Sequence, residues 1–165
     1  MSVSVPIRYI PNSLSLKDKK KQKDMLLKSR KLYKNKKYYT RKSVSSFHSK
    51  PSNHIEKARE IYNLNSIFPS REMVKATGCS LSTLLKIVKK GEGAYFSSGS
   101  RPNQTPQSWG IARLASAITS GKSAAVDYKH LEKGCDHTKK AFKLAKLARK
   151  KYGYGNRKTH KIKLN

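Results

Sequence analysis

The sequence has little of what disulfide-rich, metal-binding and catalytic proteins depend on. Only two of its 165 residues are cysteines, Cys79 and Cys135, and they form no CxxC pair. The sequence therefore predicts neither a disulfide framework nor a zinc site, and we expect two buried free thiols. The five histidines show no metal-ligand spacing, and the nine acidic residues form no paired catalytic pattern. Cys135 and His137 stand at positions i and i+2 of an expected helix start and diverge, which argues against a thiol–imidazole nucleophile.

These absences predict a protein that is not an enzyme and that needs no metal and no cofactor. Long hydrophobic runs are also missing: none approaches the roughly 18 residues that a membrane-spanning helix requires. The first 15 residues lack the charged start and apolar run of a secretory signal. We expect a soluble or peripherally bound chain, most simply one domain with tails and a modest core.

Positive charge is what the sequence has in abundance, with a net charge of +29. Residues 17–50 carry a net +12 and residues 139–163 a net +11, whereas residues 51–138 carry only +5. Such cationic segments repel themselves and stay extended unless a polyanion or an acidic surface neutralises them. The charge distribution therefore predicts a negatively charged partner: nucleic acid, an anionic membrane surface or an acidic protein lattice.

The same distribution predicts a basic N-terminal arm with one helix at 1–51, a small helical domain at 52–152 and a basic C-terminal tail at 153–165. We expect the polyanion to be bound by the lysines and arginines of these segments. They are Lys17, Lys19, Lys20, Lys21, Lys23, Lys34, Lys36, Lys37, Arg41, Lys42, Lys139, Lys140, Lys143, Lys146, Arg149, Lys150, Lys151, Arg157 and Lys158.

Helical spacing of apolar residues, with capping residues before and glycines after, predicts a mainly α fold: a small multi-helix domain with extended basic arms. Ser15 and Asp18 form the pattern of a capping box ahead of the first helix. Thr105 is expected to cap a helix that has Pro106 at its first position. The expected helices span 16–33, a short stretch that Ser52 or Asn53 caps and that runs through Tyr62, 70–78, 80–91, 106–119, 124–133 and 136–152, with Asp136 capping the last.

The segment "PSREMVKATGCSLSTLLKIVKKG" predicts a helix-turn-helix-like corner. Gly78 supplies the left-handed turn position, and part of the segment is similar to the turn and second helix of bacterial repressor domains. None of the expected groove-facing side chains is an Arg, Asn or Gln that could read a base with two hydrogen bonds. The pattern is thus also typical of a purely structural corner or of non-specific contact. Those groove-facing side chains are Ser80, Ser82, Thr83 and Lys86.

Aromatic residues alternate with lysines after the first expected helix, at Tyr33, Tyr38, Tyr39 and Phe47. Such mixtures suit single-stranded nucleic acid, because rings stack on bases while ammonium groups meet phosphates. The alternative is an extended arm whose aromatic residues anchor it to a neighbour.

A segment without lysine, "YFSSGSRPNQTPQSWG" at 95–110, stands out in so basic a chain. Its flanking aromatic residues and the capped helix that follows indicate an ordered loop at 91–110 that packs on the core, where unpaired lysines are costly to bury. Two functional alternatives remain for it: a docking face for a partner protein, or a phosphate loop without the Lys-Ser/Thr ending of a Walker motif. The residues of that partner or phosphate loop are Ser97, Ser98, Gly99, Ser100 and Arg101.

The run "KGEGAYFSSGSRPNQTPQSWGIARLASAITSGKSAAVDYKHLEKGC" resembles an uncharacterised basic domain family of large double-stranded DNA viruses, including those that infect algae. The earlier runs "SLKDKKKQKDMLLKSRKLYKNKKYYTRK" and "HIEKAREIY" are similar to the lead-in of the same family. The resemblance implies a viral origin of the algal-virus type. It implies no catalytic residues.

Together these features favour a non-enzymatic structural virion protein, a minor capsid or cement protein that binds acidic surfaces through its basic arms. Its partners would be capsid or other virion proteins, and it would have no small-molecule substrate. The alternative is a largely sequence-nonspecific DNA-binding or genome-condensing protein with a helix-turn-helix-like unit. The expected location is the virion, and the host cytoplasm or nucleus during infection.

Overall fold

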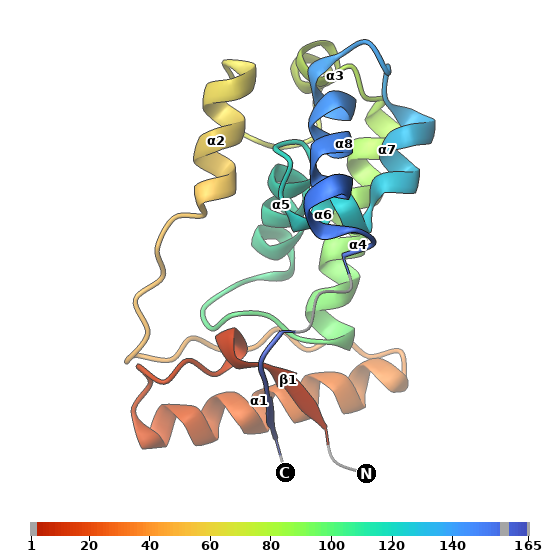
Figure 1. Cartoon of the computed structure of the whole chain (residues 1–165). Coiled ribbons are helices and arrows are strands. Elements are labelled where there is room, and N and C mark those ends of the chain that lie inside the picture. The colour runs from red at the N-terminus through yellow and green to blue at the C-terminus, as the bar shows by residue number, and fades with distance from the viewer. Residues whose placement is uncertain (1–2, 156–158, 165) are drawn as a thin grey trace. The chain divides into compact units, whose positions relative to one another are not determined.

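The fold is mainly helical, as the sequence predicted (Figure 1). The computed structural model describes residues 3–155 and 159–164, and eight α-helices, one short 3-10 helix and a two-stranded sheet lie within them. The chain begins with β1 (Ser4–Pro6), the 3-10 helix (Ile7–Tyr9) and α1 (Leu16–Lys34). It continues with α2 (Asn53–Tyr62), α3 (Arg71–Thr77), α4 (Leu81–Ser97) and α5 (Pro106–Ala117). It ends with α6 (Lys122–Val126), α7 (Tyr128–Gly134), α8 (Lys140–Tyr152) and β2 (Lys161–Lys163).

The chain forms two structural units, each assembled from separated segments. Unit 1 contains residues 1–50, 92–109 and 158–165, and unit 2 contains residues 51–91 and 110–157. Unit 1 carries 19 Lys/Arg against 3 Asp/Glu, a net +16, and unit 2 carries 19 against 6, a net +13. Both units are therefore strongly cationic, so the positive charge is not confined to the ends of the chain.

Unit 1 is organised around α1 and the sheet. Strand β1 pairs antiparallel with β2, with Val5 opposite Ile162. One face of α1 buries Met25 and Leu26 against Val5, Val44 and Leu164. A helix with so thin an apolar stripe is marginal alone, and here the chain's own N- and C-terminal segments cover it. Trp109 packs edge-on against Tyr9, with ring centroids 6.0 Å apart.

The expectation of extended arms was wrong for the residues that the structure describes. The N-terminal segment folds as part of unit 1, and residues 161–163 of the expected tail form β2. The physical reason is that each segment carries apolar residues that only a partner can bury, and the two segments partner each other. The division into units also differs from the expected one, because residues 92–109 group with the N-terminal segment and not with the helical domain.

Unit 2 is a helical cluster built on α2, α3, α6, α7 and α8, with the adjoining parts of α4 and α5. Helix α8 lies beside α6 and α7 (Figure 1). Its stripe of Ala141, Phe142, Ala145 and Ala148 is buried, as its helical spacing predicts. The rest of the core comes mainly from Met73, Leu84, Ile87, Leu114, Ile118 and Leu131.

The two cysteines are not free thiols. Cys79 and Cys135 form a disulfide that closes a sequence separation of 56 residues, and no free cysteine remains. The backbone explains why they meet: Ser80 donates its N–H to the carbonyl of Gly134, and Asp136 donates to Gly78, both at 2.8 Å. The expectation was wrong because nothing local in the sequence brings the end of α7 beside the start of α4.

Most helix starts confirm the capping residues read from the sequence. The side-chain oxygens of Ser15, Ser70 and Thr105 accept hydrogen bonds from backbone N–H groups three residues later. The cap predicted at Asp136 was wrong: α8 begins at Lys140 with Lys139 as its N-cap, and the Asp136 carboxylate accepts bonds from Thr138 instead.

Gly91 does not end α4, which continues to Ser97. Its lack of a side chain serves close packing instead, since a Cβ at Gly91 would lie 2.6 Å from the Cα of Gly110 in α5. The expected loop at 91–110 is thus helical at its beginning. Much of the remainder is buried or half-buried, as the absence of lysine predicts.

Candidate functional site

The predicted helix-turn-helix-like corner is present in unit 2. Helix α3 ends at Gly78, whose φ of 78° lies in the left-handed region and whose N–H donates to the carbonyl of Val74. Met73 on α3, and Leu84 and Ile87 on α4, are fully buried. The turn at Gly78 also packs closely against Lys139, since a Cβ at Gly78 would lie 2.5 Å from the Lys139 Cγ.

Helix α7 runs up to the beginning of α4 and completes the site. The disulfide ties the two elements together, and Gly134 packs directly on Thr83. A Cβ at Gly134 would lie 1.7 Å from the Thr83 Oγ1, so only glycine permits this approach. The side chains of α7 therefore stand beside the exposed face of α4.

That exposed face carries two adjoining hollows, which together we call the α4 groove. The larger one has a volume of about 460 Å³ and the other, at the start of the helix, about 210 Å³. The larger hollow is lined by Ser82, Leu85, Lys86, Lys89 and Lys90. The smaller one is lined by Ser80, Ser82, Thr83, Lys86, His130, Lys133 and Gly134.

The electrostatics of the α4 groove are those of an anion site. Buried Asp127 accepts two hydrogen bonds of 2.8 Å from Arg113 and one of 3.2 Å from Lys90. Its carboxylate is therefore committed to these two cations. Among the described residues, Lys86, Lys89 and Lys133 have no carboxylate partner, so their charge is available to a ligand.

Two titratable groups next to the groove have displaced pKa values. Burial alone would raise the pKa of Asp127, but the hydrogen bonds and charge of Arg113, and then of Lys90, outweigh it and hold the pKa below its usual range. The pKa of His130 is lowered, first by burial and then by the nearby ammonium of Lys90, 3.1 Å from its Nε2. The site therefore keeps its negative charge paired and its histidine neutral at pH 7.

Of the four residues expected to face a DNA groove, three are exposed and Thr83 is not. Ser80 directly precedes α4, Ser82 and Lys86 lie on it, and all three line the hollows. Thr83 is only 8% exposed, is bonded to the Ser80 hydroxyl at 2.8 Å and packs under Gly134. Lys89 and Lys90 were not expected at the site, although their spacing from Lys86 puts all three on one face. Lys133 and His130 were not expected there either, because only the packing of α7 brings them to the site.

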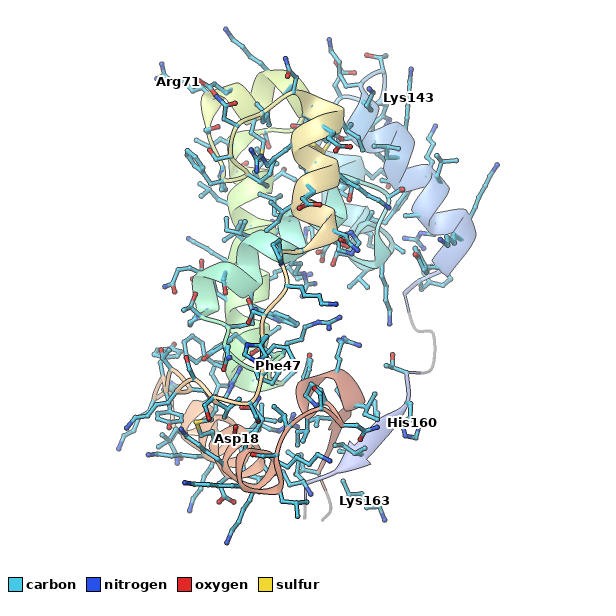
Figure 2. All side chains as sticks on the ribbon, turned by 90° about the vertical axis from the view of Figure 1, so that its left-hand side faces the viewer. Asp18, Phe47, Arg71, Lys143, His160 and Lys163 are labelled. Carbon is cyan, nitrogen blue, oxygen red and sulfur yellow. A yellow bond between two sulfur atoms is a disulfide. The ribbon has the colours of Figure 1, made fainter. Side chains whose placement is uncertain are left out.

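Most of the other expected polyanion-binding side chains are on the surface. Lys143 on α8 is an example of an exposed lysine that points away from its helix (Figure 2). Lys19, Lys23 and Arg149 are half-buried, and Arg149 lies between the rings of Tyr128 and Tyr154. Arg157 and Lys158 lie outside the described residues. The exposed members are Lys17, Lys20, Lys21, Lys34, Lys36, Lys37, Lys42, Lys139, Lys140, Lys143, Lys146, Lys150 and Lys151.

Arg41 was wrongly expected to contact a polyanion, because it is buried inside unit 1 with only 7% of its surface exposed. Its guanidinium donates to the Ser29 hydroxyl, the Tyr95 carbonyl and the Ser100 hydroxyl at 2.8–2.9 Å. It also lies 3.8 Å from the centre of the Tyr95 ring. Burial lowers its pKa, and these neutral acceptors satisfy it where no carboxylate does.

The same contacts bear on the proposed phosphate loop at 97–101. The Ser98 carbonyl accepts from Arg30, the Ser100 hydroxyl accepts from Arg41, and Gly99 packs on Leu26 and Tyr9. Ser97 is half-buried, and Arg101 is exposed at the end of the loop. Since the loop's interior groups are used to hold unit 1 together, its geometry favours a structural role over phosphate binding.

The described residues contain no group of three or more His, Cys, Asp or Glu side chains that could hold a metal ion. Within the same residues, no helix combines the length and the apolar character needed to cross a bilayer. A comparison with curated proteins and with solved structures found no match. A family model matches residues 6–141, from β1 to the first turn of α8, and thus includes segments of both units. The chain belongs to this family, a family of unknown function (DUF5824).

Proposed function

We propose that this protein is a non-enzymatic nucleic-acid-binding protein, and that the α4 groove of unit 2 binds the phosphate backbone. The observation that carries the proposal is the convergence of Lys86, Lys89 and Lys133, none of them paired with a carboxylate, beside the hydroxyls of Ser80 and Ser82. Ammonium and hydroxyl groups are the donors that hold phosphate oxygens in protein–DNA complexes. The groove lies on the second helix of a helix-turn-helix-like corner, the element that enters the major groove in repressors.

The groove's chemistry supports binding without sequence preference. Its side chains on α4 are a serine, a threonine, a leucine and lysines, and none is an Arg, Asn or Gln that could make the two-bond contact to a base edge that gives strong discrimination. The net +13 of unit 2 acts in the same direction, because long-range attraction to phosphate does not depend on sequence.

The proposal is tested by measuring duplex DNA binding against salt concentration for the whole chain. For B-DNA, log K falls with log salt at about 0.9 per neutralised phosphate. A Lys86→Ala/Lys89→Ala/Lys133→Ala variant should bind more weakly and show a shallower slope, by about 0.9 for each lysine that meets a phosphate.

The matched control removes the same charge elsewhere in unit 2, as Lys143→Ala/Lys146→Ala/Lys150→Ala on α8. These lysines are exposed and lie outside the groove. The control should lose less affinity than the groove variant. Equal losses in the two variants would show that binding follows overall charge, and no duplex binding by the wild type at low salt would end the proposal.

A second candidate is a structural component of the virion of a large double-stranded DNA virus, such as a minor capsid or cement protein. The resemblance of residues 90–135 to a viral domain family favours it, as does cationic charge on both units. In that role the partners would be capsid or other virion proteins or an anionic membrane surface, and the protein would reside in the virion and, during infection, in the host cytoplasm or nucleus. Quantitative mass spectrometry of purified virions tests it, and absence of the protein from them would exclude it.

A further inference from the structure

Unit 1 carries a row of three aromatic rings, which we call the tyrosine platform: Tyr33 and Tyr38 are exposed, and Phe96 is half-buried. The ring centroids of Tyr33 and Tyr38 are 6.2 Å apart, and those of Tyr38 and Phe96 are 5.1 Å apart. The turn after α1 creates this arrangement. Lys36 has a φ of 58°, its N–H donates to the Tyr33 carbonyl, and the next N–H donates to the Leu32 carbonyl, which reverses the chain and returns Tyr38 to the end of the helix.

The platform is open to solvent where the other rings of the segment are not. Tyr38 is 70% exposed and Tyr33 is 37% exposed. Tyr39 and Phe47, by contrast, pack against the core of unit 1, and Tyr95 is fully buried. The segment's aromatic residues therefore divide into two that pack against the core of unit 1 and two that stay exposed to solvent. A lone exposed ring is ordinary on a protein surface, but two exposed rings in mutual contact indicate a binding surface.

Lysines are close in sequence to Tyr33 and Tyr38, and none of them is paired with a carboxylate among the described residues. Lys31, Lys34, Lys36 and Lys37 are all exposed, and in the described part of the chain none has an ion-pair partner. Unit 1 has only three acidic residues in all. Exposed rings that can stack on bases and lysines that can meet phosphates are thus close together in the sequence. Surfaces that bind single strands combine the same two kinds of side chain.

We propose that the tyrosine platform binds unpaired bases of single-stranded nucleic acid. The bases stack on Tyr38 and Tyr33, and Lys34, Lys36 and Lys37 meet the flanking phosphates. Stacking needs a base face that is free, so a paired duplex does not satisfy this site. This site rests on the proposed function, because its ligand is again nucleic acid. It lies in unit 1, whereas the groove lies in unit 2, and it requires unpaired bases, which the groove does not.

The test compares two labelled oligomers of about ten nucleotides, a length within the range of single-strand site sizes. One is oligothymidine and the other has abasic sites throughout, so that the phosphates remain and the bases are gone. Fluorescence anisotropy with the whole chain, at about physiological salt, should give tighter binding of oligothymidine by about fivefold or more, since stacking on one ring accounts for a factor of that order.

Tyr38→Ala should remove most of this preference for bases while leaving the affinity for the abasic oligomer unchanged. Tyr38→Phe keeps the ring and should retain the preference. Phe68→Ala serves as the matched control, because Phe68 is a 52% exposed aromatic residue of unit 2 within a segment free of lysine, 63–74, and its removal should change neither affinity. Circular dichroism of each variant checks that the helices remain.

Two results would overturn the inference: equal binding of both oligomers by the wild type, or a base preference that Tyr38→Ala leaves intact. Either would make the exposed rings a contact surface for a protein partner instead. The groove variant Lys86→Ala/Lys89→Ala/Lys133→Ala separates the two proposals. It should weaken duplex binding and leave the oligothymidine preference unchanged, so the groove and the platform can fail independently.

Discussion

Three charged side chains are buried in the described residues, and each is compensated in its own way. Asp18 accepts hydrogen bonds from the backbone and hydroxyl of Ser46, which are the main cause of its lowered pKa. Arg41 is held by neutral oxygens and an aromatic ring. Asp127 is ion-paired, and its partners Arg113 and Lys90 come from α5 and α4. Each of these buried charges thus lies within contacts between separate parts of the chain.

Asp127 should make stability depend on pH. Its pKa is lower in the fold than in the unfolded chain, so the ionised carboxylate stabilises the protein above the unfolded value of about 4, and the effect is lost as pH falls through the folded-state pKa. Asp127→Asn leaves Arg113 without its carboxylate and should cost about 3 kcal/mol at neutral pH.

Urea unfolding at neutral pH and at about pH 3 measures this effect. The difference between wild type and Asp127→Asn should narrow at the acid pH, because below about pH 4 the carboxyl takes up a proton more readily in the unfolded chain than in the fold. A difference that stays the same at both pH values would show that the ion pair is not its cause. Asp24→Asn is the control, because Asp24 is exposed and forms no ion pair among the described residues.

The backbone of Lys36 has a left-handed conformation that a side chain makes less stable. Its φ of 58° is costly for any residue with a Cβ, and glycine removes that cost. Lys36→Gly should therefore raise the free energy of unfolding by about 1 kcal/mol, as measured by urea denaturation. Lys37→Gly, next to it but outside the left-handed region, should not stabilise, and a Lys36→Gly variant no more stable than wild type would contradict the assignment of the turn.

At the level of the helices, the contact between α4 and α7 decides the geometry of the groove. Gly134 permits the approach, the backbone bonds on each side of the cysteines set the alignment, and the disulfide locks it. The basic face of α4 would exist without α7, but Lys133 and His130 would not stand beside it.

The disulfide should stabilise the protein substantially, because it closes a long loop in the unfolded chain. Cys79→Ser/Cys135→Ser should lower the free energy of unfolding by about 2–4 kcal/mol, seen as a lower melting temperature. The wild type without reductant should show no alkylatable thiol by mass spectrometry until it is unfolded and reduced. Two reactive thiols in the native protein would support the free cysteines expected from the sequence, and an equal melting temperature for the variant would show that the bridge contributes nothing.

Considered as a whole, the chain is a polycation with almost no internal neutralisation. Two carboxylate ion pairs, both to Asp127, occur in its described residues, against a net charge of +29. Such an imbalance destabilises the folded state by self-repulsion and attracts polyanions at long range. Stability and binding should therefore respond to salt in opposite directions.

We expect the melting temperature to rise by a few degrees between low and about physiological salt, since screening weakens repulsion more than it weakens two ion pairs. Over the same range, affinity for duplex DNA should fall. Differential scanning fluorimetry with sodium chloride measures the first effect, and a neutral osmolyte at equal osmolality is the control. A falling melting temperature would mean that the few ion pairs outweigh the repulsion.

Patterns among residues close in the sequence predicted the helices, most of their caps and the helix-turn-helix-like corner. A stripe of apolar side chains, a serine before a helix or Gly78 at a turn acts through contacts a few residues apart, which the order of residues alone specifies. The exposed lysines of α4 could be found in the same way. The lysine-free segment likewise indicated burial, because composition limits what a core can hold.

Contacts between residues that are far apart in the sequence depended on tertiary packing, and the sequence did not predict them. Cys79 meets Cys135, β1 pairs with β2, and Asp127 collects its two cations, each across tens of residues or more. Whether such residues meet is decided by which surfaces bury the most apolar area together, and no local pattern encodes that choice. The sequence by itself therefore determined the charge and the helices, whereas tertiary packing decided the groove, the contact of Phe96 with Tyr38 and the burial of Arg41.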